Sequence, residues 1–162
     1  MRLTHRPVAE QDLAAICAFT QSAAELFYCF PKADFPLTPA QLQAAIDQRS
    51  DSTVVLLEGA VVAFANFYRW ETGGVCSIGN VMVAPAARGR GVARYLIEQM
   101  LDTAFTRHQA CEVQVSCFNQ NVAGLLLYPQ LGFLPCSVEE RVGKGDERLA
   151  LIHFRLEPPA CR

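Results

Sequence analysis

Hydrophobic and polar positions recur along this chain with the spacing of helices in some segments and of strands in others. One helical spacing follows the acidic residues Glu10 and Asp12 and continues to Phe27. The clearest helical segment carries charged side chains on one side and apolar side chains in two columns, at Val92, Ala93, Leu96, Ile97, Met100, Leu101, Ala104 and Phe105. Both patterns predict amphipathic helices that pack on a hydrophobic core.

A third helix is predicted from its starting signals. Thr38 supplies a hydroxyl cap, Pro39 takes the first helical position and Gln41 comes three residues after the cap. This helix should continue to about Gln48. Strand spacing occupies residues 3–8, 53–57, 61–68, 75–83, 111–117, 137–142 and 148–154. With a last helix after residue 121, the predicted order is β-α-α-β-β-β-α-β-α-β-β.

Size and composition bound the class of protein. The chain has 162 residues, 51% of them hydrophobic, which is enough for one well-buried domain over residues 1–162 and short for two. It has no apolar run of the roughly 18 residues that span a membrane, and its first residues lack the apolar core of a signal peptide. We therefore expect a cytoplasmic protein without a membrane partner.

Charge and cysteine content narrow the class further. A formal net charge of −2 without a long basic run leaves a nucleic acid little to bind, so we expect no nucleic-acid partner. The seven cysteines include no Cys-x-x-Cys pair. Several fall in apolar segments, among them Cys17, Cys76, Cys111 and Cys117. We interpret them as reduced core residues and expect no metal site.

The candidate chemistry begins in the loop before the helix that starts at Val92. Backbone N–H groups at a helix start have no partner within the helix, so they point at whatever lies over that end. Gly89 and Gly91 permit positive φ and close approach of a ligand, and Arg88 and Arg90 add positive charge. The loop is therefore a predicted anion site, and a diphosphate suits it.

Two familiar phosphate sites are excluded by the residues at fixed offsets. A Walker-type loop needs Gly-Lys-Ser/Thr, which the chain lacks. A dinucleotide site needs Gly-x-Gly-x-x-Gly, but Arg94 stands at the third glycine. A dinucleotide site also needs an acidic residue about 20 residues later, at the end of the next strand, to bind the ribose. Glu112 has that spacing, but it stands at the start of the strand.

The remaining pattern, Arg88-x-x-Gly91-x-Ala93 after a strand that ends in Val-Ala-Pro, resembles a loop of the GNAT superfamily of acyl-CoA-dependent N-acyltransferases. In that family the loop holds the pyrophosphate of the cofactor. The resemblance implies the residues around the loop that would bind acetyl-CoA (coenzyme A), the acyl donor: Val81, Met82, Val83, Arg88, Gly89, Arg90, Gly91, Val92 and Ala93.

A second motif follows in the order that the family has. The run that begins at Asn121 and contains Tyr128 before Leu-Gly-Phe is similar to the GNAT run Asn-x-x-Ala-x-x-x-Tyr-x-x-Leu-Gly-Phe, with Gly124 in place of the alanine. Seven residues make two helical turns, so Asn121 and Tyr128 should point to the same face. Asn121 would contact the cofactor or its neighbouring backbone, although a plain helix cap would look the same.

The resemblance covers essentially the whole chain and implies its fold. It implies an α/β (α+β) fold, with a mixed, mainly antiparallel sheet of about six or seven strands flanked by about four helices. In the family, the strand before the phosphate loop and the next strand splay apart, and the pantetheine arm lies between them. Here these are the predicted strands at residues 75–83 and 111–117.

The implied reaction is direct attack of a primary amine on the acetyl thioester in a ternary complex. Tyr128 matches the family's acid, although a helix-end tyrosine packed on Phe133 would look the same. Pro129 disfavours helical geometry at Tyr128, so the helix should end or kink there.

The general base is the main departure from the family. Many relatives carry a glutamate on the strand before the phosphate loop, but residues 77–81 include no carboxylate. The open candidates are Glu71, Glu25 and Asp34, or a water held by Asn80. The missing carboxylate also motivates an alternative function, a non-catalytic acyl-CoA-binding or regulatory module of the same fold.

The acceptor is the least defined part. The aromatic segment 27–31 and the side chains of Tyr68 and Trp70 are candidates to line the acceptor site, where they would hold an amine or form an apolar wall. A small molecule, an amino acid or a peptide or protein amine would all serve. We also expect a homodimer, paired through the predicted C-terminal hairpin at residues 137–154.

Overall fold

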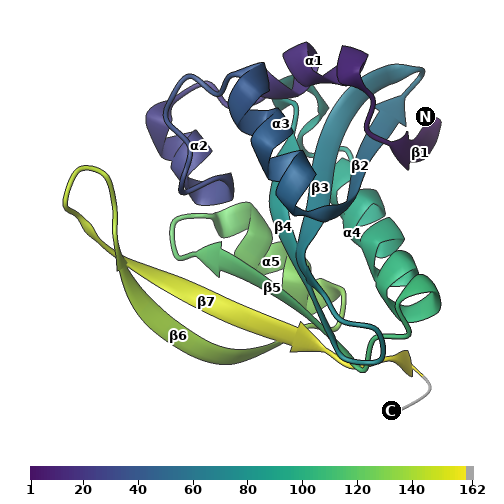
Figure 1. Cartoon of the computed structure of the whole chain (residues 1–162). Helices are drawn as coiled ribbons and strands as arrows, with labels where there is room; N and C mark the ends of the chain where they lie inside the picture. The colour runs from purple at the N-terminus through teal and green to yellow at the C-terminus, as the bar shows by residue number, and fades with distance from the viewer. Residues whose placement is uncertain (160–162) are drawn as a thin grey trace.

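The computed structural model describes residues 1–159, which form one seven-stranded sheet with the strand order β1-β2-β3-β4-β5-β7-β6 (Figure 1). The strands are β1 (Leu3–Pro7), β2 (Ser50–Leu57), β3 (Ala60–Trp70), β4 (Val75–Val83), β5 (Glu112–Phe118), β6 (Leu134–Val142) and β7 (Arg148–Leu156). All neighbours pair antiparallel except β4 and β5. The mixed, mainly antiparallel sheet is therefore confirmed.

Helices cover both faces of this sheet. They are α1 (Leu13–Cys17), α2 (Ala23–Cys29), α3 (Pro39–Gln48), α4 (Val92–Asp102) and α5 (Val122–Gln130). Alternation along the strands explains the two layers: Val54 and Phe64 are buried with α1 to α3, while their neighbours Val55 and Ala65 are buried in the larger core with α4. Figure 1 shows α1, α2 and α3 grouped on one side of the sheet.

The prediction of one continuous helix from Glu10 to Phe27 is wrong. A short 3-10 turn, Glu10–Asp12, leads into α1, which ends at Cys17, and α2 begins only at Ala23. Ser22 has an extended backbone (φ −151°, ψ 161°), and its hydroxyl accepts a hydrogen bond of 3.1 Å from the Glu25 N–H. A serine cap of this kind starts a new helix, which is why α1 and α2 are separate.

Other predicted boundaries agree more closely. The Thr38 hydroxyl caps α3 by accepting from the Gln41 N–H at 3.3 Å, and the strand predicted at residues 75–83 is β4. The strand β6 begins at Leu134, three residues before its predicted start. It is the edge strand of the sheet and exposes Val138 and Val142. Within residues 1–159, no helix is long and apolar enough to cross a membrane.

The parallel strands β4 and β5 separate part-way along their length. Their pairing runs from Val75 opposite Glu112 to Ile78 opposite Val115 and stops there. Beyond that point β4 continues toward the start of α4, while β5 stays paired with β7 as far as Phe118. The splayed strands predicted from the sequence are thus present, and they open a wedge in the sheet.

Candidate functional site

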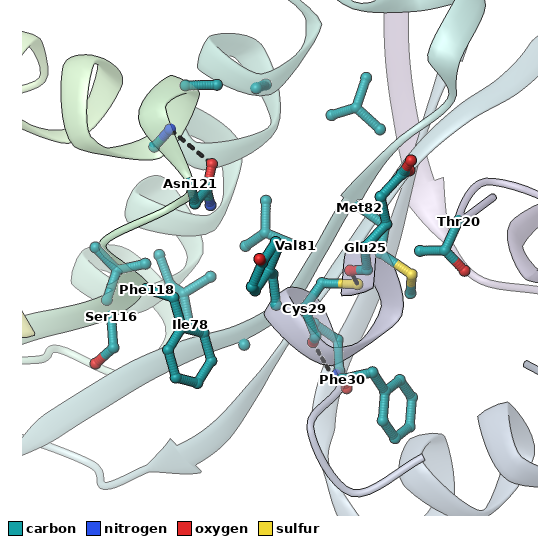
Figure 2. Close-up of a pocket in the computed structure, with 18 of the residues that line it drawn as sticks. Thr20, Glu25, Cys29, Phe30, Ile78, Val81, Met82, Ser116, Phe118 and Asn121 are labelled. Atoms are coloured by element: carbon teal, nitrogen blue, oxygen red, sulfur yellow. Dashed lines mark hydrogen bonds between the residues drawn. The ribbon is translucent and has the colours of Figure 1, made fainter. Parts of the chain in front are cut away.

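A cavity of about 1210 Å³ occupies this wedge and extends across it to α2 (Figure 2). Typical pockets for one small ligand measure roughly 300–1,000 Å³, so this space is large enough for two ligands at once. Of the residues that the sequence assigned to acetyl-CoA, all except Arg90 line the cavity. Tyr128 lines it too.

The predicted anion loop has the backbone that its glycines suggested. Gly89 and Gly91 have φ values of 74° and 78°, and Gly91 is the N-cap of α4. Among the described residues, no acceptor bonds the backbone N–H groups of Gly89, Arg90 or Gly91. Gly89 and Gly91 line the cavity, so their unpaired N–H groups and the positive end of the helix dipole border one end of it.

Arg88 is engaged by a side chain from the other side of the cavity. Its Nη2 lies 3.0 Å from Oε1 of Glu25, which is on α2. Both side chains are substantially exposed, so a phosphate oxygen could replace the carboxylate at modest energetic cost. The pair links the anion loop to α2.

The strand β4 carries a β-bulge where it borders the cavity. Phe64 pairs with Met82 and Asn66 pairs with Gly79, which leaves both Asn80 and Val81 opposite one residue of β3. Asn80 has a positive φ of 50°. A bulge interrupts the hydrogen-bond ladder and re-aims the backbone, so β4 can present backbone groups to the cavity here.

Asn121 and Tyr128 lie on one face of α5, as their spacing predicted. The Asn121 side chain caps α5 by accepting from the Gly124 N–H at 3.1 Å (Figure 2). A Cβ on Gly124 would lie 3.0 Å from the Asn121 side chain and 3.2 Å from the Tyr128 ring, so both approach this glycine closely. The helix runs one residue past Pro129, to Gln130.

Tyr128 is 4% exposed, and its ring packs on Phe133 and Phe154 with centroids 5.8 Å apart in both pairs. Burial is the main reason that the pKa of its phenol is raised above the usual value. The phenol is therefore protonated at neutral pH. Within the described chain its hydroxyl makes no hydrogen bond, so it is a donor at the cavity wall without an acceptor.

Two of the three candidate bases lie away from the cavity. Glu71 pairs with Arg69 at 2.7 Å and accepts from the Val75 N–H, which holds the turn between β3 and β4. Asp34 is 94% exposed and pairs with Lys144. Only Glu25 lines the cavity, and it is paired with Arg88.

The predicted aromatic wall is present in part. Tyr28, Phe30 and Tyr68 line the cavity. Phe27 instead packs on Phe118 with ring centroids 5.1 Å apart, and Trp70 is not among the lining residues. The three lining side chains come from α2, from the residue that follows it and from β3.

A buried polar network that sequence analysis missed forms the floor beside this wall. Arg49 donates to Asn66 at 3.2 Å, Asn66 donates to Asn80 at 3.1 Å, and Asn80 donates to the carbonyl of Cys29 at 2.9 Å. The Arg49 guanidinium also lies 5.5 Å from the centroid of the Tyr68 ring. Asn80 thus uses its side chain to tie β4 to α2.

A second missed group spans three neighbouring strands. Ser116 Oγ on β5 lies 2.5 Å from Nδ1 of His153 on β7, and Nε2 of His153 lies 2.8 Å from Oε1 of Glu139 on β6. Ser116 and His153 line the cavity. Their positions in the sequence are far apart and follow no motif, so only the strand order β5-β7-β6 reveals the group.

Comparison with known sequences adds one match. The sequence model of the Acetyltransferase (GNAT) family matches residues 16–133, which is more than half of the chain. That stretch contains the anion loop, β5 and α5. No curated protein sequence matches the chain.

Solved structures with the same fold share little sequence with this chain. Spermidine N-acetyltransferase from Vibrio cholerae, in complex with CoA and spermine, is 20% identical, with a TM-score of 0.80 over 96% of this chain and 95% of that one. Ribosomal-protein-alanine N-acetyltransferase from Brucella melitensis is 21% identical, with a TM-score of 0.78 over 96% and 99%. The yncA protein from Salmonella typhimurium, with its cofactor acetyl-CoA, is 23% identical, with a TM-score of 0.76 over 96% and 93%.

Proposed function

Because the chain belongs to the acetyltransferase (GNAT) family, we propose that it is an N-acetyltransferase that transfers the acetyl group of acetyl-CoA to a primary amine. One observation carries the proposal. The wedge between β4 and β5 joins the helix-capped anion loop, the Tyr128 phenol and a separate aromatic wall in one cavity. A cavity of this kind suits a long donor with a diphosphate at one end and a second substrate at the other.

The donor would lie along β4. Its diphosphate would take the N–H groups of the loop and the guanidinium of Arg88, and its pantetheine arm would pair with the backbone from Val81 to Val83 as an added strand does. Structures of two proteins with this fold hold acetyl-CoA or CoA, which supports the same donor here. Asn121, which caps the start of α5, would contact the donor or the backbone beside it.

The reaction would proceed by direct attack. The amine nitrogen bonds to the thioester carbonyl carbon, the C–S bond breaks, and the sulfur leaves with its electron pair and takes a proton, while one N–H bond of the nitrogen breaks and its proton restores the proton donor. Tyr128 is the donor that we assign to this proton, since its protonated phenol borders the cavity without another partner. Backbone N–H groups at the bulge of Asn80 and Val81 are the donors that we assign to the carbonyl oxygen.

The test is release of free thiol from acetyl-CoA in the presence of a broad amine library. We expect thiol release that depends on both protein and amine, with one N-acetylated product for each thiol. Acetyl-CoA binding without turnover over the whole library would instead favour a non-catalytic acyl-CoA-binding or regulatory module.

A further inference from the structure

Arg49 differs from the other arginines that line the cavity. Arg88 pairs with Glu25, Arg94 with Glu98 and Arg141 with Glu139. Arg49 is half-buried, and residues 1–159 give it no carboxylate partner; its one hydrogen bond goes to the neutral side chain of Asn66. Burial, the larger influence, lowers the pKa of its guanidinium, because the charged form loses water without gaining an anion.

The protein leaves space for this guanidinium. A Cβ on Gly79 would lie 2.7 Å from Nη1 of Arg49 and 2.7 Å from the Tyr68 ring, so a side chain at residue 79 would displace both. Tyr68 supports the cation by lying beneath it. Nη2 and Nε of Arg49 make no hydrogen bond within the described chain. A planar pair of free donors at a cavity wall matches the two oxygens of a carboxylate.

The charge of the whole cavity agrees. Within the described chain Glu25 is the sole carboxylate that lines it, whereas the lining cations are Lys32, Arg49, Arg88, Arg94 and Arg141. Since Arg88, Arg94 and Arg141 are paired with carboxylates, the positive charge of the lining that has no carboxylate partner among the described residues is that of Arg49 and Lys32, and it attracts anions.

We propose that Arg49 binds an acidic group of the acceptor, so that the acceptors are small amines that also carry a carboxylate, as amino acids do. The proposal rests on the proposed N-acetyltransferase function and names its substrate class.

The test compares amino acids with their carboxamides and their decarboxylated amines, each with acetyl-CoA. We expect the acids to have roughly 10- to 100-fold higher kcat/KM, the range that a charged hydrogen bond provides. Arg49→Gln should remove most of this preference and Arg49→Lys should retain part of it, with acetyl-CoA affinity unchanged. Arg69→Gln is the matched control, because Arg69 pairs with Glu71 and does not line the cavity.

Equal kcat/KM values of the wild type for acids and decarboxylated amines would overturn the proposal. A fall of kcat/KM in Arg49→Gln that is the same for both kinds of acceptor would also overturn it. Calorimetry of the acids with the CoA-loaded protein keeps the test separate from catalysis. Binding that Arg49→Gln abolishes, without any turnover, would support the subsite while rejecting the acetyltransferase function. If the acids bind neither the wild type nor Arg49→Gln while other amines are acetylated, the carboxylate subsite is rejected and the acetyltransferase function is not.

A second inference follows from Ser116, His153 and Glu139. The two contacts of the imidazole are both satisfied when Nε2 carries the proton, since Nε2–H donates to Glu139 and Nδ1 accepts from the Ser116 hydroxyl. Ser116 directly follows Val115, the last residue of β5 that pairs with β4, so the hydroxyl lies where the wedge opens. Figure 2 shows Ser116 on the cavity wall.

We infer that this group takes the proton of the acceptor ammonium, a step that again requires the proposed function. An N–H bond of the ammonium breaks and leaves its electron pair on nitrogen. Its proton passes to Ser116 Oγ, whose own proton passes to Nδ1 of His153. Glu139 then faces the imidazolium at Nε2. Two further groups on β6 adjoin this site: Arg141, which pairs with Glu139, and Cys136, whose thiol donates to the His153 carbonyl.

The pH dependence of kcat/KM tests this role. Ser116→Ala and His153→Gln should each lower kcat/KM about 10²-fold at neutral pH, which is the lower range for general base catalysis. This loss should shrink as the pH rises, because the amine then loses its proton unaided. Ser116→Thr should restore activity. His5→Gln is the control, since His5 contacts Tyr95 outside the cavity. A loss that is the same at every pH, or unchanged acetylation in His153→Gln, would reject the relay, and acetyl-CoA affinity reports whether each variant keeps its fold.

Discussion

The two ends of the cavity are built in different ways. The proposed donor end is lined mainly by one continuous segment, from Val81 on β4 to Ala93 on α4, whose loop offers backbone N–H groups. The proposed acceptor end is lined by residues from separate elements, including Tyr28 on α2, Arg49 after α3 and Ser116 on β5. A backbone site depends on the path of the chain, whereas a side-chain site depends on each residue. The acceptor end can therefore change its ligand without altering the donor end.

Tyr128 lines the cavity and is our proposed proton donor, so its loss should have the largest effect. Tyr128→Phe removes only the hydroxyl, which makes no hydrogen bond to the described residues, and should preserve the packing on Phe133 and Phe154. We expect kcat to fall about 10²-fold with acetyl-CoA affinity unchanged. Steady-state kinetics with acetyl-CoA binding by calorimetry would measure both.

Tyr95→Phe provides the comparison for that result. This variant also removes one hydroxyl, but the Tyr95 hydroxyl contacts His5, and Tyr95 does not line the cavity. A tenfold or larger fall of kcat in this variant, or none in Tyr128→Phe, would mean that the phenol of Tyr128 has no special role.

A change at Gly91 should weaken the donor end and leave the acceptor end intact. Its φ of 78° suits glycine, and a left-handed backbone costs another residue roughly 1–2 kcal/mol. Gly91→Ala should lower stability by this amount or move the loop backbone out of its left-handed conformation, which displaces its N–H groups. We therefore expect the Kd of acetyl-CoA to rise by about tenfold and the KM of the acceptor to stay close to its wild-type value.

Gly59→Ala separates backbone strain from ligand binding. Gly59 has a φ of 86° in the turn between β2 and β3, far from the cavity lining, and its Cβ would also meet open space. We expect Gly59→Ala to lower the free energy of unfolding about as much as Gly91→Ala does, with no change in the Kd of acetyl-CoA. Equal loss of affinity in both variants would show that the anion loop has no specific part in binding.

The smallest effect is expected outside the cavity, in the turn between β1 and α1. Asp12 is 3% exposed, accepts from Arg6 at 2.7 Å and from the Ala9 N–H at 2.8 Å, and the Arg6 hydrogen bond is the main reason that its pKa lies below the usual value. Asp12→Asn should reduce the free energy of unfolding by about 1 kcal/mol at pH 7, because Arg6 is partly exposed.

The pH dependence of that loss has a defined sign. A carboxyl whose pKa is depressed in the folded state stabilises the fold above its unfolded pKa of about 3.9 and loses this contribution as the pH falls through the folded value. Thermal unfolding of both proteins should therefore show a difference that is present at neutral pH and shrinks below about pH 4. A constant difference would mean that the charge of Asp12 contributes nothing.

The contrast between the two ends also explains what the sequence could predict. The positive φ of Gly89 and Gly91, the cap at Thr38 and the strand β4 depend on neighbouring residues, and these predictions were accurate. The break between α1 and α2 was missed because the apolar spacing continues through Phe19 and Thr20, which are both buried. The Ser22 cap gave a signal that this spacing obscured.

The acceptor end was beyond sequence analysis for a physical reason. Arg49 precedes β2, Asn66 is on β3 and Asn80 is on β4, so their network exists only once those strands pair. Ser116 and His153 meet because β7 lies beside β5. Without the strand order, Glu71 and Asp34 looked as suitable as any other base, and the structure places both outside the cavity.

The measurement that tests the account most directly is the initial rate of thiol release while acetyl-CoA and the amine are varied together. If both ends of the cavity are filled at once and the amine attacks the thioester directly, the double-reciprocal lines will intersect. Parallel lines, together with an acetylated protein isolated in the absence of amine, would show that the acetyl group first passes to the protein and would contradict direct transfer within one cavity.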